Sequence, residues 1–93
     1  MRKTFQVIED PGHAWVEVPL EFLEKLGIMG SISPYSYINP RTDLAYLEED
    51  CDMLVFHQAF REKFHTDPKY NESHQNNTFI RGLPSFSTVK TLA

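Results

Sequence analysis

The sequence predicts an α+β domain: a small antiparallel sheet, with its elements in the order ββαββαβ, and two helices packed on one face of that sheet. Three observations lead to this class. Short runs of alternating apolar and polar residues indicate strands. Two segments with apolar residues three and four positions apart indicate helices. Turn-forming residues separate these runs. A chain of 93 residues has room for one domain.

The first 18 residues predict a β-hairpin. The strand Thr4–Glu9 places Phe5 and Val7 on one face. Asp10, Pro11 and Gly12 favour a tight turn, because proline fixes one backbone dihedral angle and glycine accepts a positive φ. Residues 13–18 return as a second strand whose two faces differ. One face carries Ala14, Val16 and Val18, and the other carries His13, Trp15 and Glu17.

A short helix and a second hairpin are expected next. Pro19 suits the start of a helix over Leu20–Leu26, and Gly27 suits the left-handed position that ends it. Residues 34–38 and Leu44–Glu48 are expected to form paired strands, with Tyr35 and Tyr37 on one face.

The longest helix is expected over residues 50–64, with Asp50 as its N-cap. Its apolar residues form two adjacent rows, which are Cys51, Val55 and Ala59 in one and Phe56, Phe60 and Phe64 in the other. Polar residues 70–78 predict a loop, and residues 78–81 a last short strand. The domain is therefore expected to span residues 1–81. Residues 82–93 are expected to be a partly ordered tail that docks through Leu83 and Phe86.

Charge and cysteine content argue against several classes of protein. The net charge is −4, and no basic patch is visible, so nucleic acid and anionic membranes are unfavourable partners. No apolar run is long enough for a membrane span or a signal peptide, which predicts a cytoplasmic protein. Cys51 is the only cysteine, so neither an internal disulfide nor a multi-cysteine zinc site is possible. We expect no cofactor, and a monomer or small homo-oligomer.

Residues 42–60 contain five acids and no lysine or arginine: Asp43, Glu48, Glu49, Asp50 and Asp52. A helix start selects acids for local reasons. The same run is also able to steer a basic partner or to bind a divalent cation, although it lacks the glycine of a calcium loop. We predict that four of these acids bind a partner and face a basic surface on it: Asp43, Glu48, Glu49 and Asp52.

No catalytic constellation is predicted. The four histidines lack metal-ligand spacing, and Cys51 and His57 are six residues apart, so their side chains diverge on a helix. Turn chemistry explains Asp10 next to His13. Neighbouring carboxylates should raise the pKa of Cys51, which is expected to be a packing thiol. The alternative is a small metal-dependent or hydrolytic enzyme that uses Asp10, His13 or the acidic run.

Trp15, Tyr35 and Tyr37 are candidate partner-binding aromatics. If helices cover only one face of the sheet, either Trp15 or the valines of the same strand must face solvent. Exposed aromatics anchor protein interfaces. Cross-strand packing is the simpler explanation. The stacking of nucleic-acid bases is a further alternative, which the missing basic residues weaken.

Four segments together resemble a family of small single-domain proteins carried by bacteriophages, plasmids and other mobile elements. They are residues 12–19 (GHAWVEVP), 32–37 (ISPYSY), 46–52 (YLEEDCD) and 79–84 (FIRGLP). The resemblance covers about residues 5–86. The family has no assigned activity, so it implies no catalytic residue. It implies a cytoplasmic setting in a bacterial host, and a non-enzymatic module that binds and modulates a host protein or defence complex.

Overall fold

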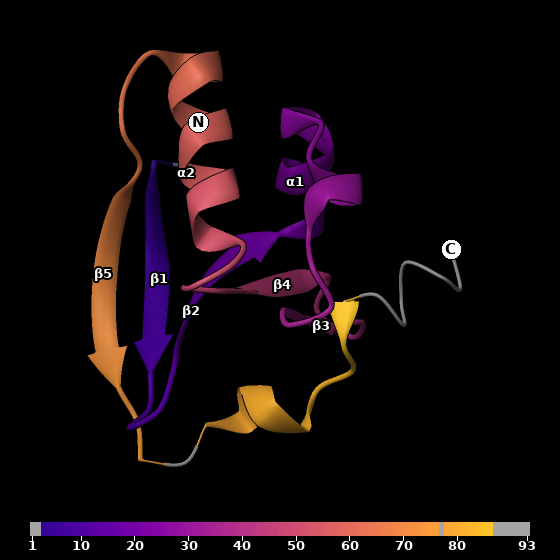
Figure 1. Cartoon of the computed structure of the whole chain (residues 1–93), viewed down its shortest axis with the longest axis vertical. Coiled ribbons are helices and arrows are strands. Elements are labelled where there is room, and N and C mark those ends of the chain that lie inside the picture. The colour runs from indigo at the N-terminus through magenta and orange to yellow at the C-terminus, as the bar shows by residue number, and fades with distance from the viewer. Residues whose placement is uncertain (1–2, 77, 87–93) are drawn as a thin grey trace.

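The computed structural model describes residues 3–76 and 78–86, which form a five-stranded mixed sheet with two helices on one face (Figure 1). The strands are β1 (Thr4–Glu9), β2 (Ala14–Pro19), β3 (Tyr37–Asn39), β4 (Leu44–Glu48) and β5 (Lys69–His74). The helices are α1 (Leu20–Leu26) and α2 (Met53–Phe64), and two short 3-10 helices span Met29–Ser31 and Phe79–Gly82. The α+β class and the order ββαββαβ are therefore confirmed.

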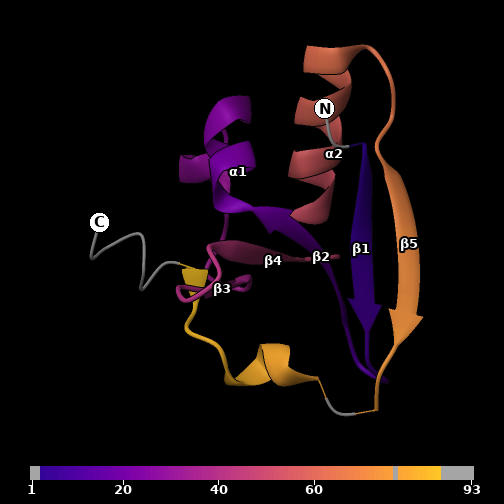
Figure 2. The same cartoon turned by 180° about the vertical axis from the view of Figure 1, so that it is seen from behind.

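The sheet has the strand order β3-β4-β2-β1-β5. The predicted hairpins are both present: β1 pairs with β2, and β3 with β4, in antiparallel fashion. The expectation of a purely antiparallel sheet is wrong, because β5 runs parallel to β1 at the edge, as both arrows in Figures 1 and 2 show. Helix α2 lies between β4 and β5 in the chain, and this crossover returns the chain in the direction of β1.

The last strand is formed by different residues from those predicted. Residues 70–78 were expected to be a loop, yet Lys69–His74 form β5, whose side chains are mostly exposed. A strand at the edge of a sheet is exposed and needs no alternating apolar pattern. The polar sequence of β5 therefore gave no signal from which a strand could be predicted. The strand expected over residues 78–81 is instead the 3-10 helix Phe79–Gly82.

Other element boundaries shift for local reasons. Gly27 ends α1 with φ +73°, and the Ile28 N–H donates to the Leu23 carbonyl, as expected for this end. Helix α2 begins at Met53 rather than at residue 50, because residues 48–52 form a turn in which Cys51 and Asp52 donate to the Glu48 carbonyl. Its N-cap residue is Asp52, not Asp50, and the Asp52 side chain does not cap the helix. The third strand starts at Tyr37, so Tyr35 lies in the preceding turn.

The core lies on both faces of the sheet. Between the sheet and the helices, Phe5 packs edge-to-face against Phe22, Phe56 and Phe60. On the opposite face, Trp15 and Tyr46 pack with Ile8 and with Ile80 of the C-terminal segment. The prediction that either Trp15 or the valines of the same strand face solvent is therefore wrong. Trp15, Val16 and Val18 are all buried, because Ile80 and Leu83 cover the second face.

The segment after the last 3-10 helix is tied to β3. Phe86 is buried in the helix-side core and Leu83 is half-buried against the Trp15 cluster, so both dock as expected. The Ile38 N–H donates to the Pro84 carbonyl, and the Phe86 N–H donates to the Ser36 carbonyl. Residues 87–93 of the predicted tail lie outside the described residues. Within the described part of the chain, no helix combines the length and apolarity needed to cross a membrane.

Candidate functional site

A small pocket lies on the sheet face that the helices do not cover. It has a volume of about 180 Å³. Residues from four separate parts of the chain line it: His13, Trp15, Pro34, Tyr35, Tyr37, Glu48 and Arg81. Four of the seven residues predicted as partner-binding, namely Trp15, Tyr35, Tyr37 and Glu48, are therefore brought together here.

Glu48 provides the buried carboxylate of the pocket. It is the last residue of β4 and lies directly opposite Trp15 of β2. One carboxylate oxygen, Oε1, is 3.3 Å from His13 Nδ1, and the other, Oε2, accepts the Asp50 N–H at 2.8 Å. The Glu48 N–H donates to the Ser36 hydroxyl at 3.0 Å. Backbone and side chain are both held, so the direction of the carboxylate is fixed.

His13 enters the pocket from the turn between β1 and β2. Its backbone N–H donates to Asp10 Oδ1, which also accepts the Gly12 N–H. Asp10 therefore contacts the backbone of the turn, as turn chemistry predicts. The imidazole ring lies 5.9 Å from the Trp15 ring, centroid to centroid, and its side chain is 44% exposed. Glu48, 35 residues away, is its carboxylate partner.

Arg81 brings a positive charge that Asp10 balances. Its Nε and Nη2 donate to the two Asp10 oxygens at 2.6 and 3.0 Å, and its guanidinium lies 5.4 Å from the centre of the Trp15 ring. Hydrogen bonding to Arg81 holds the pKa of Asp10 well below its usual range, although burial opposes the shift. This two-point ion pair leaves little net positive charge for a ligand.

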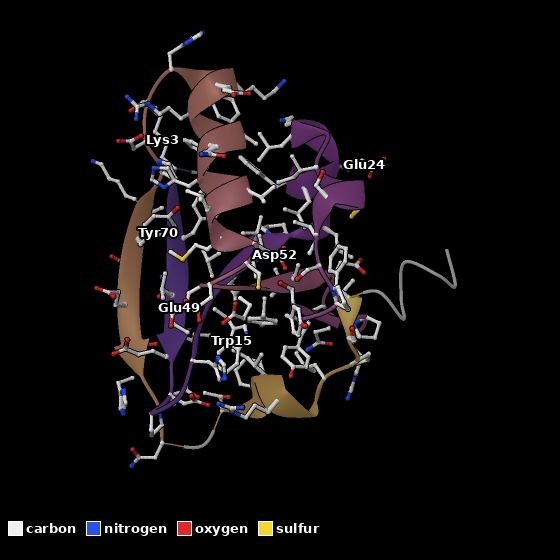
Figure 3. All side chains as sticks on the ribbon, in the orientation of Figure 1. Lys3, Trp15, Glu24, Glu49, Asp52 and Tyr70 are labelled. Carbon is white, nitrogen blue, oxygen red and sulfur yellow. The ribbon has the colours of Figure 1, made fainter. Side chains whose placement is uncertain are left out.

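The five acids of the predicted window do not form one surface. Asp43 lies at the opposite end of β4 from Glu48, in a second pocket with Glu21 and Glu24. Glu49 and Asp50 are exposed. Asp52 is hydrogen-bonded to the Glu48 carbonyl through its N–H but does not line the pocket, and Figure 3 shows it between Trp15 and the helices.

Asp52 is almost completely buried and has a structural partner set. It accepts the Ser33 N–H at 3.0 Å and the Ser33 hydroxyl at 2.6 Å, and the Ser36 hydroxyl donates to the same carboxylate. These hydrogen bonds hold residues 33–36 against the start of α2. Asp52 is therefore not exposed to a partner in this structure.

The aromatic residues differ in accessibility. Tyr35 is 68% exposed and Tyr37 is half-buried, whereas Trp15 is 1% exposed. Trp15 is therefore a buried wall of the pocket rather than an exposed anchor, and its indole N–H has no hydrogen-bond partner among the described residues. Tyr46, the fourth aromatic on this face, is buried and donates to Glu17.

Two further carboxylates lie near Glu48. Asp50 is close to Glu48 and His13, whereas Glu49 lines a separate hollow with His57 and Tyr70. Desolvation raises the pKa of Glu49, and the charges of Asp50, Glu48 and Glu9 raise it further. Desolvation and a hydrogen bond to Glu48 likewise raise the pKa of Cys51, in the predicted direction. The expectation that Cys51 packs inside is wrong, because the residue lies in the turn before α2 and is exposed.

The predicted partner-binding residues include Glu48 but neither His13, its partner in the pocket, nor Arg81. Strand alternation predicts that His13 lies on the same face as Trp15, but it does not predict the contact with Glu48. No local pattern links Arg81 to Asp10, which is 71 residues away. Comparison with protein-family models, with curated proteins and with solved structures gives no match for this chain.

Proposed function

We propose that the protein is a non-enzymatic protein-interaction module, of the kind that mobile elements use to modulate a host protein. Its partner carries a basic surface. One arginine or lysine side chain of that partner enters the pocket between Tyr35, Tyr37 and Glu48. The observation that carries this proposal is the combination of exposed Tyr35, half-buried Tyr37 and the fixed Glu48 carboxylate around one pocket.

Aromatic faces beside a carboxylate favour a cation. A guanidinium or ammonium group is attracted to the face of a tyrosine ring, and it forms charge-assisted hydrogen bonds with a carboxylate. Exposed Asp50, whose carboxylate lies close to that of Glu48 and to His13, adds negative charge beside the pocket. Asp10 neutralises Arg81. The charge balance of the pocket is therefore negative.

The size of the pocket fits a side chain better than a small-molecule substrate. Its volume of about 180 Å³ is below the ~300–1,000 Å³ that is typical of pockets for drug-sized ligands. Rim charges act mainly on the association rate, and an aromatic contact at the centre acts mainly on dissociation. Glu49 and Asp50 would steer the partner, and Tyr35 would hold it.

The test is a titration of the metal-free protein with an arginine-rich peptide, followed by NMR of the backbone amides. The matched peptide carries citrulline, the neutral isostere, in place of each arginine. We expect shifts of the amides of Tyr35, Tyr37 and Glu48 with the arginine peptide only, and weaker binding as salt increases. Equal binding of both peptides would contradict the proposal.

Two variant pairs locate the contact. Tyr35→Ala should weaken binding about tenfold, the equivalent of ~1.4 kcal/mol, within the range of a cation–π contact. Phe79→Ala, which removes another exposed aromatic, should not weaken binding.

Glu49→Lys should slow association, whereas Glu62→Lys on the outer surface of α2 should not. If Tyr35→Ala leaves the binding unchanged, the peptide does not bind in this pocket and the proposal is contradicted. Labelled single-stranded DNA that competes with the peptide would favour the nucleic-acid alternative.

A further inference from the structure

We infer that His13, Glu48 and Asp50 form a binding site for a divalent transition metal ion of the Zn²⁺ type. Within the described part of the chain, these three side chains form a group whose possible ligand atoms all lie within 4.8 Å of one another. They come from the β1–β2 turn, the end of β4 and the turn before α2. This inference goes beyond the proposed interaction function and does not depend on it.

The distance between the first two ligand atoms fits a tetrahedral zinc ion. Zn–N and Zn–O bonds are ~2.0–2.2 Å long, so two ligand atoms on one tetrahedral ion lie ~3.3–3.5 Å apart. His13 Nδ1 and Glu48 Oε1 are 3.3 Å apart. The separation of these two atoms therefore matches the spacing of two ligands on one tetrahedral ion. Asp50 is exposed, so its side chain is able to turn towards the same ion as the third ligand.

The surroundings of the ligands hold them in place. Glu48 Oε2 accepts the Asp50 N–H, which directs Oε1 towards His13. The His13 ring packs beside Trp15, and Asp10 holds the His13 backbone. Outer contacts that orient metal ligands are typical of protein metal sites. The remaining coordination positions face the solvent side, because His13 and Asp50 are both exposed.

The donor set and the local charge select the class of ion. An imidazole nitrogen is a favourable ligand for Zn²⁺ and its neighbours in the transition series, whereas Ca²⁺ and Mg²⁺ take oxygen ligands. Further negative charge lies nearby. Glu49 stands between the two acidic ligands in the chain, and Glu9 pairs with Ala14, whose carbonyl accepts the Glu49 N–H. A dication is attracted by this field and relieves the repulsion within it.

The experiment is a titration of the full chain, purified without a polyhistidine tag and stripped of metal, with Zn²⁺ by calorimetry. We expect one ion per chain. His13→Gln and Glu48→Gln should each weaken binding about tenfold or more. Asp50→Asn, an exposed change that leaves the fold intact, should weaken it as well. The matched control is His74→Gln. His74 also faces a carboxylate, Glu9 at 3.6 Å, but belongs to no such group of three among the residues that the structure describes.

A second readout reports where the ion binds. Trp15 is the only tryptophan, and its ring is 5.9 Å from the His13 ring. Co²⁺ bound at His13 should quench Trp15 fluorescence at a ratio of one ion per chain and give the visible absorption of tetrahedral cobalt, and Zn²⁺ should reverse both. Binding that is the same in His13→Gln as in the wild type, binding that His74→Gln abolishes, or saturation without quenching would each overturn the inference. The arginine-peptide titration is performed without metal, so either proposal is able to fail alone.

Discussion

At the scale of single residues, buried carboxylates are used to hold loops in place. Asp10 joins the β1–β2 turn to Arg81 of the C-terminal segment, and Asp52 joins residues 33–36 to the start of α2. Each carboxylate accepts several hydrogen bonds, as a charged group removed from water must. Removing either one should therefore cost stability in a way that a surface acid does not.

Stability should fall in acid because of Asp10. Its pKa is depressed in the folded protein, so its contribution is fully present above the unfolded value of about 3.9 and is lost as the pH falls below that value. We expect Arg81→Gln to be less stable than the wild type near neutral pH and to lose less stability on acidification. Urea unfolding from about pH 7 to pH 2 measures both, with Glu62→Gln as an exposed control. Parallel pH profiles for wild type and Arg81→Gln would contradict the role of this ion pair.

Asp52→Ala should destabilise the fold by about 1–3 kcal/mol, because it leaves the buried Ser36 hydroxyl without its acceptor. Asp50→Ala, two residues earlier and exposed, should change the unfolding free energy by less than ~0.5 kcal/mol in metal-free buffer. Chemical denaturation of the two variants gives the comparison. Equal losses would mean that the acids of this turn act through general charge rather than through specific hydrogen bonds.

At the scale of elements, helix α2 packs against the sheet and α1 through one of its faces. Phe56 and Phe60 are completely buried against Phe5 and Phe22, as the i, i+4 spacing predicts. Leu54, on the opposite side of the same helix, is 61% exposed. The predicted row of Cys51, Val55 and Ala59 contributes less, since Cys51 precedes the helix and Val55 and Ala59 are only half-buried.

Phe60→Ala should lower the free energy of unfolding by about 3–5 kcal/mol, because it opens a cavity in the aromatic cluster. Leu54→Ala in the same helix should cost less than ~1 kcal/mol, since little apolar area is buried there. Urea denaturation followed by circular dichroism measures both. If the two substitutions cost the same, the helix does not pack through the Phe60 face.

At the scale of the whole molecule, the C-terminal segment completes the fold. The 3-10 helix Phe79–Gly82 lies on the side of the sheet away from α1 and α2, as Figure 1 shows. Ile80 and Leu83 pack there against Trp15 and Tyr46. The chain is therefore built in three layers over much of the sheet, with β5 supplying a further edge. The pocket is assembled where this third layer meets the turn that carries His13.

Ile80→Asn should expose or loosen the Trp15 cluster, because Ile80 is completely buried against it. We expect the fluorescence of Trp15, the only tryptophan, to shift to longer wavelength, and stability to fall by about 2 kcal/mol or more. Phe79→Asn, next to it and 49% exposed, is the control and should have a smaller effect. Equal emission spectra for wild type and Ile80→Asn would show that this segment does not seal the second face.

The sequence by itself determined the elements whose causes are local. The turn at Pro11 and Gly12, the left-handed end of α1 at Gly27 and the aromatic rows of α2 each depend on residues within a few positions, so their outcome was predictable. The alternation predicted for residues 13–18 also put His13 and Trp15 on one face, and their rings do lie side by side although His13 precedes β2. These features supplied the fold class and four residues of the candidate pocket.

Only the tertiary structure decided what covers each face and which charges meet. The pairing of β5 with β1, the burial of Trp15 under Ile80, and the contacts His13–Glu48 and Asp10–Arg81 join segments 35 to 71 residues apart along the chain. No repeating pattern encodes such contacts, because they depend on the path of the whole backbone. For the same reason the five acids within residues 43–52 do not share one surface. Asp43 is exposed at the far end of β4, Glu48 and Asp52 are buried, Asp50 lies beside the pocket and Glu49 lines a different hollow.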